Sequence, residues 1–175
     1  MIIEMTVETR NLRIIPCTPE ILEAAIAGNK SLAKKLGVTV PEIWTEFGIG
    51  ALQYAFDKLS EDEDERGWWT YFPIHKQDNK LIGSGGYKGK PTAGGTVEIG
   101  YEIATDYRNR GLAKELAVAL IENAFKDKRV KSIIAHTLAE ENPSTRVLTK
   151  SNFEKVEVIN DPDDGLIWKW ELKKQ

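Results

Sequence analysis

Residues 96–120 read TVEIGYEIATDYRNRGLAKELAVAL, and this stretch decides the fold class. From 96 to 103 apolar and polar side chains alternate, which predicts a β-strand with two different faces. Apolar residues then recur at helical spacing through 111–127, which predicts an amphipathic helix. A second β-rich segment at 131–138 completes a strand–helix–strand unit, whose strands should be parallel with a right-handed crossover.

The turn between this strand and helix carries positive charge and a glycine. The first backbone N–H groups of a helix lack partners and the helix dipole is positive there, so the turn suits an anion such as a diphosphate. Gly111 would let a ligand approach the backbone closely. The alternative is an exposed basic loop without a ligand. The predicted binding residues are Arg108, Asn109, Arg110, Gly111, Leu112, Ala113 and Lys114.

The rest of the chain adds helices and strands on both sides of this unit. Thr18 and Pro19 predict the start of a helix that ends at Gly28. Further helices are expected at 31–36, 50–60 and 143–151, and further strands at 11–16, 68–76, 80–87, 153–159 and 166–172. We therefore predict one α/β (α+β) domain over residues 1–175, with a mixed central sheet flanked by helices.

The bulk composition argues against several classes of protein. A net charge of −3 and a pI of about 5.6 give no reason to expect a nucleic-acid partner. No apolar run approaches ~18 residues, and the first residues lack the pattern of a signal peptide, so we expect no membrane partner. With Cys17 as the single cysteine and two histidines, we expect neither a disulfide nor a metal site. These features favour a cytoplasmic location.

Two pairs of polar residues lie before and after the predicted helix of this unit. Glu98 and Glu102 share one strand face with Gly100 between them, which leaves space for a narrow ligand; the alternative is the polar face of a half-buried strand. Asn142 and Ser144 follow the strand at 131–138. They are expected to contact a ligand or to cap the next helix, and the two roles are compatible.

Other features have more ordinary explanations. The glycine-rich segment 83–90 lacks the Ser or Thr that a phosphate-binding loop carries after its lysine, and no dinucleotide-binding motif joins a strand to a helix. The acidic run 61–65 predicts a solvated loop, with a cation-attracting cavity mouth as the alternative. His136 is predicted to lie in the core or at its rim, with a catalytic role as the alternative. Three tryptophans are expected in the core, with an acceptor pocket as the alternative: Trp44, Trp68 and Trp69.

Three segments, in order, resemble the GNAT superfamily of N-acetyltransferases, and its RimJ/RimL-like branch most closely. Residues 95–116 resemble the acetyl-coenzyme A motif, whose core [QR]-x-x-G-x-[GA] is matched by Arg108, Gly111 and Ala113. Residues 141–153 resemble the downstream motif N-x-x-S-x-R-V-L-E-K-x-G-F, and residues 7–14 resemble the opening strand of the branch.

The downstream segment departs from the family pattern in three ways. Asn142 stands two residues before Ser144, where the pattern has three, and Asn152 replaces a glycine. Many relatives carry a tyrosine near this motif as the catalytic acid, but none stands between Glu140 and Phe153.

The resemblance implies a GNAT-like fold in which parallel strands around 96–103 and 131–138 splay apart to admit the pantetheine of acetyl-coenzyme A (acetyl-CoA). It implies an acceptor-side part over about 1–75, an acetyl-CoA-binding core over about 80–155, and a homodimer. The diphosphate would rest on 108–113. Further contacts to this co-substrate would come from Ile103, Ala104, Thr105, Asn142 and Ser144.

The implied reaction is the direct attack of a primary amine on the thioester within a ternary complex. The amine must lose a proton, so a base is needed, and we favour Glu98 over Glu102. Ser144 is expected to donate a proton or a hydrogen bond to the departing thiolate. The acceptor would be a protein N-terminus or a small amine. The alternative functions are a non-catalytic coenzyme A-binding sensor or structural module, and the binding of an unrelated nucleotide at the same turn.

Overall fold

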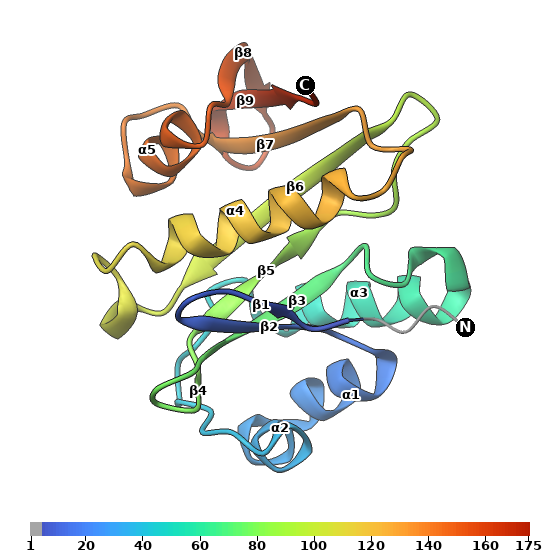
Figure 1. Cartoon of the computed structure of the whole chain (residues 1–175), viewed down its shortest axis with the longest axis vertical. Helices are drawn as coiled ribbons and strands as arrows, with labels where there is room; N and C mark the ends of the chain where they lie inside the picture. The colour runs from blue at the N-terminus through green and yellow to red at the C-terminus, as the bar shows by residue number, and fades with distance from the viewer. Residues whose placement is uncertain (1–4) are drawn as a thin grey trace.

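The computed structural model describes residues 5–175. Residues 1–4, the start of the segment expected not to be a signal peptide, lie outside the described residues. Within the described part, nine strands form one mixed sheet in the order β1-β2-β3-β5-β6-β7-β9-β8, with β4 paired to β3 (Figure 1). The strands are β1 (Val7–Glu8), β2 (Leu12–Pro16), β3 (Thr70–His75), β4 (Lys80–Leu81), β5 (Gly83–Tyr87), β6 (Thr96–Ile103), β7 (Ser132–Leu138), β8 (Glu154–Asp161) and β9 (Gly165–Lys173).

The helices begin and end close to the predicted signals. Thr18 caps the first helix by accepting a hydrogen bond from the Ile21 N–H at 3.3 Å. Asn152 adopts a φ of 68°, the left-handed conformation that asparagine tolerates in place of the family's glycine. The α+β fold class is therefore confirmed. The helices are α1 (Pro19–Ala27), α2 (Asn29–Leu36), α3 (Gly48–Glu61), α4 (Leu112–Phe125) and α5 (Pro143–Lys150).

The helices cover the two faces of the sheet with separate apolar cores. Leu116 of α4 and Leu148 of α5 belong to the core that includes Ile99 of β6. Helices α1, α2 and α3 pack on the other face, in a core that includes Phe72 and Ile74 of β3. Figure 1 shows α4 lying across β6 and β5, with α1 and α2 at the end of the molecule opposite β8 and β9. Among the described helices, none has the length and apolar character needed to span a bilayer.

Strand β5 explains why the glycine-rich segment is not a phosphate loop. It runs in the interior of the sheet, between β3 and β6. A Cβ added to Gly86 would stand 1.9 Å from the Trp69 carbonyl oxygen, because Gly86 has a φ of 133° and crosses β3 closely. These glycines therefore serve close strand packing.

Strands β6 and β7 part from one another at their midpoints. They pair in parallel only at Thr96↔Ser132, Val97↔Ile133 and Glu98↔Ile134. Beyond Glu98, β6 stays paired with β5, while β7 stays paired with β9 along its whole length. Because each strand follows a different neighbour, a wedge-shaped gap opens between them, and the predicted splay is confirmed.

Candidate active site

The turn before α4 presents backbone N–H groups. Gly111 is the N-cap residue with a φ of 76° and a ψ of 6°, a left-handed conformation that favours glycine. The carbonyl of Gly111 accepts the helical bond from the Glu115 N–H at 3.1 Å. No side chain of residues 5–175 caps this helix, so its first turn offers N–H groups and a positive dipole end to an anion.

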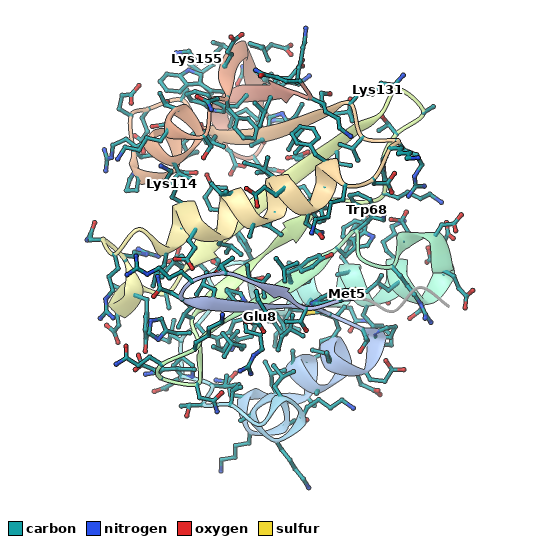
Figure 2. The ribbon with its side chains drawn as sticks, in the orientation of Figure 1. Met5, Glu8, Trp68, Lys114, Lys131 and Lys155 are labelled. Atoms are coloured by element: carbon teal, nitrogen blue, oxygen red, sulfur yellow. The ribbon has the colours of Figure 1, made fainter. Side chains whose placement is uncertain are left out.

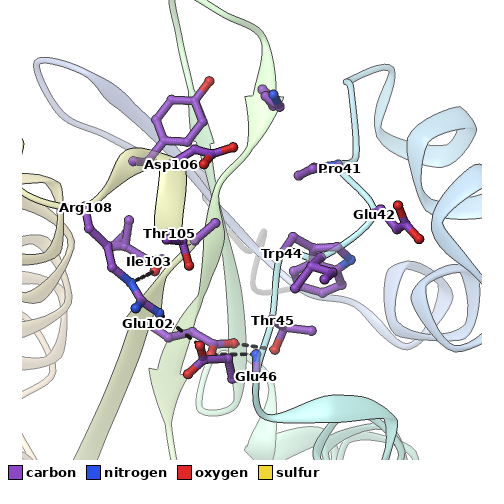
Figure 3. Close-up of a pocket in the computed structure, with 14 residues that line it drawn as sticks. Pro41, Glu42, Trp44, Thr45, Glu46, Glu102, Ile103, Thr105, Asp106 and Arg108 are labelled. Carbon is purple, nitrogen blue, oxygen red and sulfur yellow. Dashed lines mark hydrogen bonds and ion pairs between the residues drawn. The ribbon is translucent and has the colours of Figure 1, made fainter.

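The arginine side chains of this turn are engaged by the protein itself. Arg108 turns inward, donating from Nε to the Ile103 carbonyl at 2.8 Å and pairing its Nη2 with Glu46 Oε1 at 3.1 Å (Figure 3). The Arg110 guanidinium lies 4.8 Å from the centre of the Tyr107 ring. The guanidinium groups of Arg108 and Arg110 are therefore engaged within the protein, while the backbone N–H groups of the turn stay open to an anion. Figure 2 places Lys114 on the first turn of α4.

The gap between β6 and β7 opens into a cavity of about 800 Å³. Its floor is the gap itself, with Gly100, Tyr101 and Ala135, and its far wall is α3 with Trp69. One continuous space therefore joins the splayed strands to the α3 side of the sheet. Cavities of this size hold small ligands or parts of larger ones.

The backbone that lines the gap differs from the expected one. The Glu98 carbonyl accepts from the Lys88 N–H at 3.0 Å, and the Ala104 N–H donates to the Ile82 carbonyl at 2.7 Å. The backbone N–H and C=O groups of the even-numbered residues of β6 therefore point toward β5. Those of the odd-numbered residues, Tyr101 among them, point toward the gap. The Ala104 N–H is already paired and the Ile103 carbonyl accepts from Arg108, so the backbone of Tyr101 is more open to the gap than that of residues 103–104.

A charged cluster stands on the α3 face where the strands divide. Glu98 Oε1 lies 2.8 Å from Lys88 Nζ and 2.8 Å from His136 Nδ1. Burial acts to raise the pKa of Glu98, but the hydrogen bonds from Lys88 and His136 outweigh it, so the pKa lies below its ordinary value. His136 is a quarter exposed and lines the cavity, so its predicted rim position is confirmed.

Glu102, the second carboxylate of this face, is an anchor for the segment 41–47. Its carboxylate accepts from the Thr45 hydroxyl and, at 2.9 Å, from the Glu46 N–H (Figure 3). Burial raises the pKa of Glu102 despite these bonds. A second pocket, of about 370 Å³, lies between this segment and the 102–108 turn. The carboxylate of Glu102 is thus committed to holding the wall between the two pockets.

On the opposite face, Tyr101 reaches the downstream motif. Its hydroxyl lies 3.5 Å from both Oγ and the carbonyl oxygen of Ser144. Burial raises the pKa of Tyr101, so its hydroxyl keeps its proton at neutral pH. No tyrosine stands between Glu140 and Phe153, but Tyr101 of β6 brings a phenol hydroxyl beside Ser144 of that segment. The alternation in 96–103 puts Tyr101 on the strand face opposite Glu98 and Glu102, and only the packing of α5 shows that its hydroxyl reaches the gap.

Asn142 has the capping role that the sequence allowed. Its Oδ1 accepts from the Thr145 N–H at 2.9 Å, and its own N–H donates to Thr145 Oγ1 at 2.9 Å, forming a capping box for α5. This cap fixes the start of α5 and with it the place of Ser144 beside the gap.

The three tryptophans divide between core and cavity, and the acidic run lies away from the cavity. Trp44 and Trp68 are buried in the cores as predicted, whereas Trp69 lines the cavity and packs edge-on against Tyr54 at 5.4 Å. The acidic run 61–65 lies outside the cavity lining. Its Asp62 pairs with a lysine, Lys90, at 2.6 Å. The geometry therefore gives no support to a cation-attracting mouth.

Comparison with known proteins identifies the family of the chain. A family model described as the acetyltransferase (GNAT) domain matches residues 16–154. The chain belongs to the GNAT acetyltransferase family. The RimJ/RimL-like branch expected from the sequence is confirmed, and this GNAT protein is an N-acetyltransferase, an enzyme of a family that uses acetyl-CoA as co-substrate.

Individual relatives share the GNAT fold over most of their length. An uncharacterised N-acetyltransferase of Bacillus subtilis (strain 168), YjdG, is 26% identical over 147 residues, covering 83% of this chain and 88% of the relative. A ribosomal-protein-S5-alanine acetyltransferase from Vibrio fischeri has a TM-score of 0.71 at 15% identity, covering 97% of this chain and 96% of that one. A spermidine N-acetyltransferase from Vibrio cholerae has a TM-score of 0.66 at 15% identity, covering 94% and 95%. At such identities the structures show a common fold.

Proposed function

We propose that the enzyme transfers the acetyl group of acetyl-CoA to a primary amine by direct attack within a ternary complex. The observation that carries this proposal is the continuity of the gap with the 800 Å³ cavity. A donor lying between β6 and β7 leaves the α3 side open, so an acceptor can reach the thioester while the donor is bound. Direct transfer needs both substrates in place together, and the space provides for both.

The residues fit acetyl-CoA at two places. The first turn of α4, with its uncapped N–H groups at Leu112, Ala113 and Lys114, suits the diphosphate. The backbone of Tyr101, which faces the gap, suits the amide groups of pantetheine, and its N–H suits the carbonyl oxygen of the acetyl group. We assign the donor side to about residues 80–155 and the acceptor side to about 1–75, since α3 and Trp69 line the cavity wall.

The α-amine of a protein or peptide is the acceptor that this cavity favours. Its α3 wall is largely apolar and aromatic, with Phe47, Tyr54 and Trp69, and none of the described residues that line it carries a carboxylate. The nearby Glu98 lies outside this lining and is already paired with the cation of Lys88. A polyamine needs unpaired carboxylates for its other charges, and the acidic run lies elsewhere. These features support a protein or peptide α-amine, the kind of acceptor that the name of the Vibrio fischeri enzyme gives for that protein, rather than spermidine.

The ionisation of the two kinds of amine also favours an α-amine as the acceptor. An α-amine, with a reference pKa of ~7.7–8.0, is neutral in roughly one molecule in ten at neutral pH, while a lysine amine is neutral in about one in 2,500. The base of an α-amine acetyltransferase therefore has less work to do than that of a lysine acetyltransferase.

We assign the two proton transfers, from the amine and to the sulfur, to opposite faces of the gap. The Lys88–Glu98–His136 cluster stands on the acceptor side and takes the proton from the amine. Tyr101 and Ser144 stand on the other face, where the sulfur departs, and the Tyr101 hydroxyl supplies a proton or a hydrogen bond to it. Ser144 keeps this hydroxyl in place.

A screen of acceptors tests the proposal by detecting free coenzyme A thiol. Peptides with free N-termini, the same peptides with the N-terminus blocked and an internal lysine, and spermidine are compared at equal concentration. We expect turnover of the free N-termini above the other two classes. Turnover of spermidine alone would contradict the acceptor assignment, and binding of acetyl-CoA without turnover of any amine would favour a coenzyme A-binding module. Stabilisation by ATP or NAD but not by acetyl-CoA would favour the unrelated nucleotide.

A further inference from the structure

Glu98 is poorly suited to take the amine proton itself. One of its oxygens, Oε1, receives both Lys88 Nζ and His136 Nδ1 at 2.8 Å. These donors hold the carboxylate in its ionised form and lower its affinity for a proton. A proton acceptor works best when its affinity for protons is near that set by the working pH, so a carboxylate stabilised in this way is a weak base.

His136 is the member of the cluster that is open to the cavity. It follows Ile134, the last residue of β7 paired with β6, on the same strand face, so it stands at the fork of the gap. A quarter of its side chain is exposed and it lines the cavity. Its Nδ1 lies against the carboxylate, while within residues 5–175 no hydrogen bond reaches its Nε2.

The contact with Glu98 decides the tautomer of the ring. An ionised carboxylate accepts hydrogen bonds and donates none, so His136 must carry its proton on Nδ1 when it is neutral. The lone pair then sits on Nε2. A neutral imidazole with a free lone pair, held by a carboxylate behind it, is the arrangement of a general base.

We propose that His136 Nε2 accepts the proton of the acceptor amine, and that Glu98 is a positioning residue that fixes the ring and stabilises its charged form. This inference rests on the proposed acetyltransferase function. The amine nitrogen loses one proton to Nε2 and its lone pair forms the C–N bond to the acetyl carbon. The C–S bond breaks and its electron pair goes to sulfur, which receives a proton from the Tyr101 side. The nitrogen, which is positively charged once the C–N bond has formed, loses its second proton to solvent, and solvent restores the proton that Tyr101 gave to sulfur. The imidazolium also releases its proton to solvent. An ammonium and acetyl-CoA thus give an amide, coenzyme A thiol and one proton.

Other charged groups also act on His136. Lys88 and Glu98 face it from the end of β5 and from β6, Lys169 lies opposite it in the β7–β9 register, and Asp161 interacts with it from the end of β8. The cations and carboxylates are balanced in number, and the carboxylate in direct contact is that of Glu98. The pH dependence of the reaction therefore belongs to this set of groups, with the imidazole as its exposed member.

Nitrogen NMR of the full chain tests the hydrogen bond without any substrate. The chain has only two histidines, His75 and His136, so ring signals are assigned by removing one of them. We expect His136 to show the Nδ1–H tautomer in the wild type and to lose this preference in Glu98→Ala. An Nε2–H tautomer in the wild type would overturn the proposal.

Kinetics test the proton transfer. With acetyl-CoA and a short alanine-initiated peptide, or the best amine of the screen, His136→Gln should lose about 10²–10⁴-fold in kcat/KM at neutral pH. The loss should shrink as the pH rises through the pKa of the amine, because a growing share of the amine is then already neutral and has no ammonium proton to give to the base. His75→Gln is the matched control, since His75 lies at the end of β3 outside the cavity lining, and it should keep the wild-type rate.

Glu98→Gln separates positioning from catalysis. Its side-chain oxygen still accepts from Nδ1, so it should lose only about tenfold, and its pH profile should keep the acid limb that His136→Gln lacks. A larger loss in Glu98→Gln than in His136→Gln would overturn the inference and make Glu98 the base. A wild-type rate in His136→Gln would also overturn it while leaving the proposed function intact. A wild type that turns over no amine overturns the proposed function, and this inference with it.

Discussion

Tyr101→Phe is expected to slow the chemical step without unfolding the protein. The substitution removes one hydroxyl that lies at the limit of hydrogen bonding, 3.5 Å from Ser144 Oγ. The ring remains in place against the core that β6 and α4 share. Little stability is therefore lost, and any loss of rate reports on the hydroxyl itself.

The size of the effect follows from the role of the hydroxyl. Burial raises the pKa of Tyr101, so at neutral pH the phenol is a proton-bearing donor facing the departing sulfur. A hydrogen bond to a charged group contributes about 1.5–3 kcal/mol, and this bond forms only as the thiolate develops. The expected loss in kcat is therefore about 10- to 150-fold, with the affinity for acetyl-CoA little changed.

The assay is the release of coenzyme A thiol at saturating acetyl-CoA and peptide, with the thermal midpoint measured for each variant. Ser144→Ala is the comparison, because it removes the neighbour of the hydroxyl and leaves the phenol. We expect it to lose less than Tyr101→Phe. Wild-type kcat in Tyr101→Phe together with a large loss in Ser144→Ala would refute the reasoning and return the role of acid to the serine.

The other predictions concern Glu102, the turn before α4 and the effect of pH on stability. Glu102→Gln should keep kcat within about tenfold of wild type, because its carboxylate holds the segment 41–47, whereas loss of a general base costs about 10²–10⁴-fold; steady-state kinetics would contradict this if the loss reached that range. Gly111→Ala should lower the free energy of unfolding by about 1 kcal/mol, the cost of a left-handed alanine, and weaken acetyl-CoA binding about fivefold as its N–H groups shift; calorimetry showing wild-type affinity would argue against the turn as the anion site. Since hydrogen bonds from Lys88 and His136 lower the folded-state pKa of Glu98, its stabilising contribution is present above about pH 4.5 and is lost as the pH falls through the folded value. Urea unfolding of Glu98→Gln between about pH 3 and 6 should show a smaller pH dependence than wild type, and equal slopes would count against the cluster.

Much of the fold could be predicted because it depends on local periodicity. The alternation in 96–103 and the helical spacing in 111–127 set the strand–helix unit that the structure shows as β6 and α4. The caps at Thr18 and Asn142 are equally local, since each side chain bonds to backbone three residues away. Such signals lie within one turn or one strand, where sequence spacing fixes distance.

The site was less predictable because it depends on register between strands. Glu98 was singled out from its own strand, but its partners Lys88 and His136 come from the end of β5 and from β7. Tyr101 was placed on the apolar face, correctly, yet its hydroxyl reaches Ser144 only because α5 packs beside the gap. The arginines of the turn were expected to meet an anion, whereas Arg108 turns inward to Ile103 and Glu46.

The sequence by itself determined the strand–turn–helix that prepares an anion site, and the three motifs that resemble the family. These depend on residue types at fixed spacing along one chain. Only the tertiary structure decided which charged groups contact one another. The Glu98 carboxylate, which the sequence suggests as a base, is hydrogen-bonded by Lys88 and His136 from neighbouring strands. Ionisation depends on what lies within a few ångströms in space, and that distance is set by the pairing of strands rather than by their order.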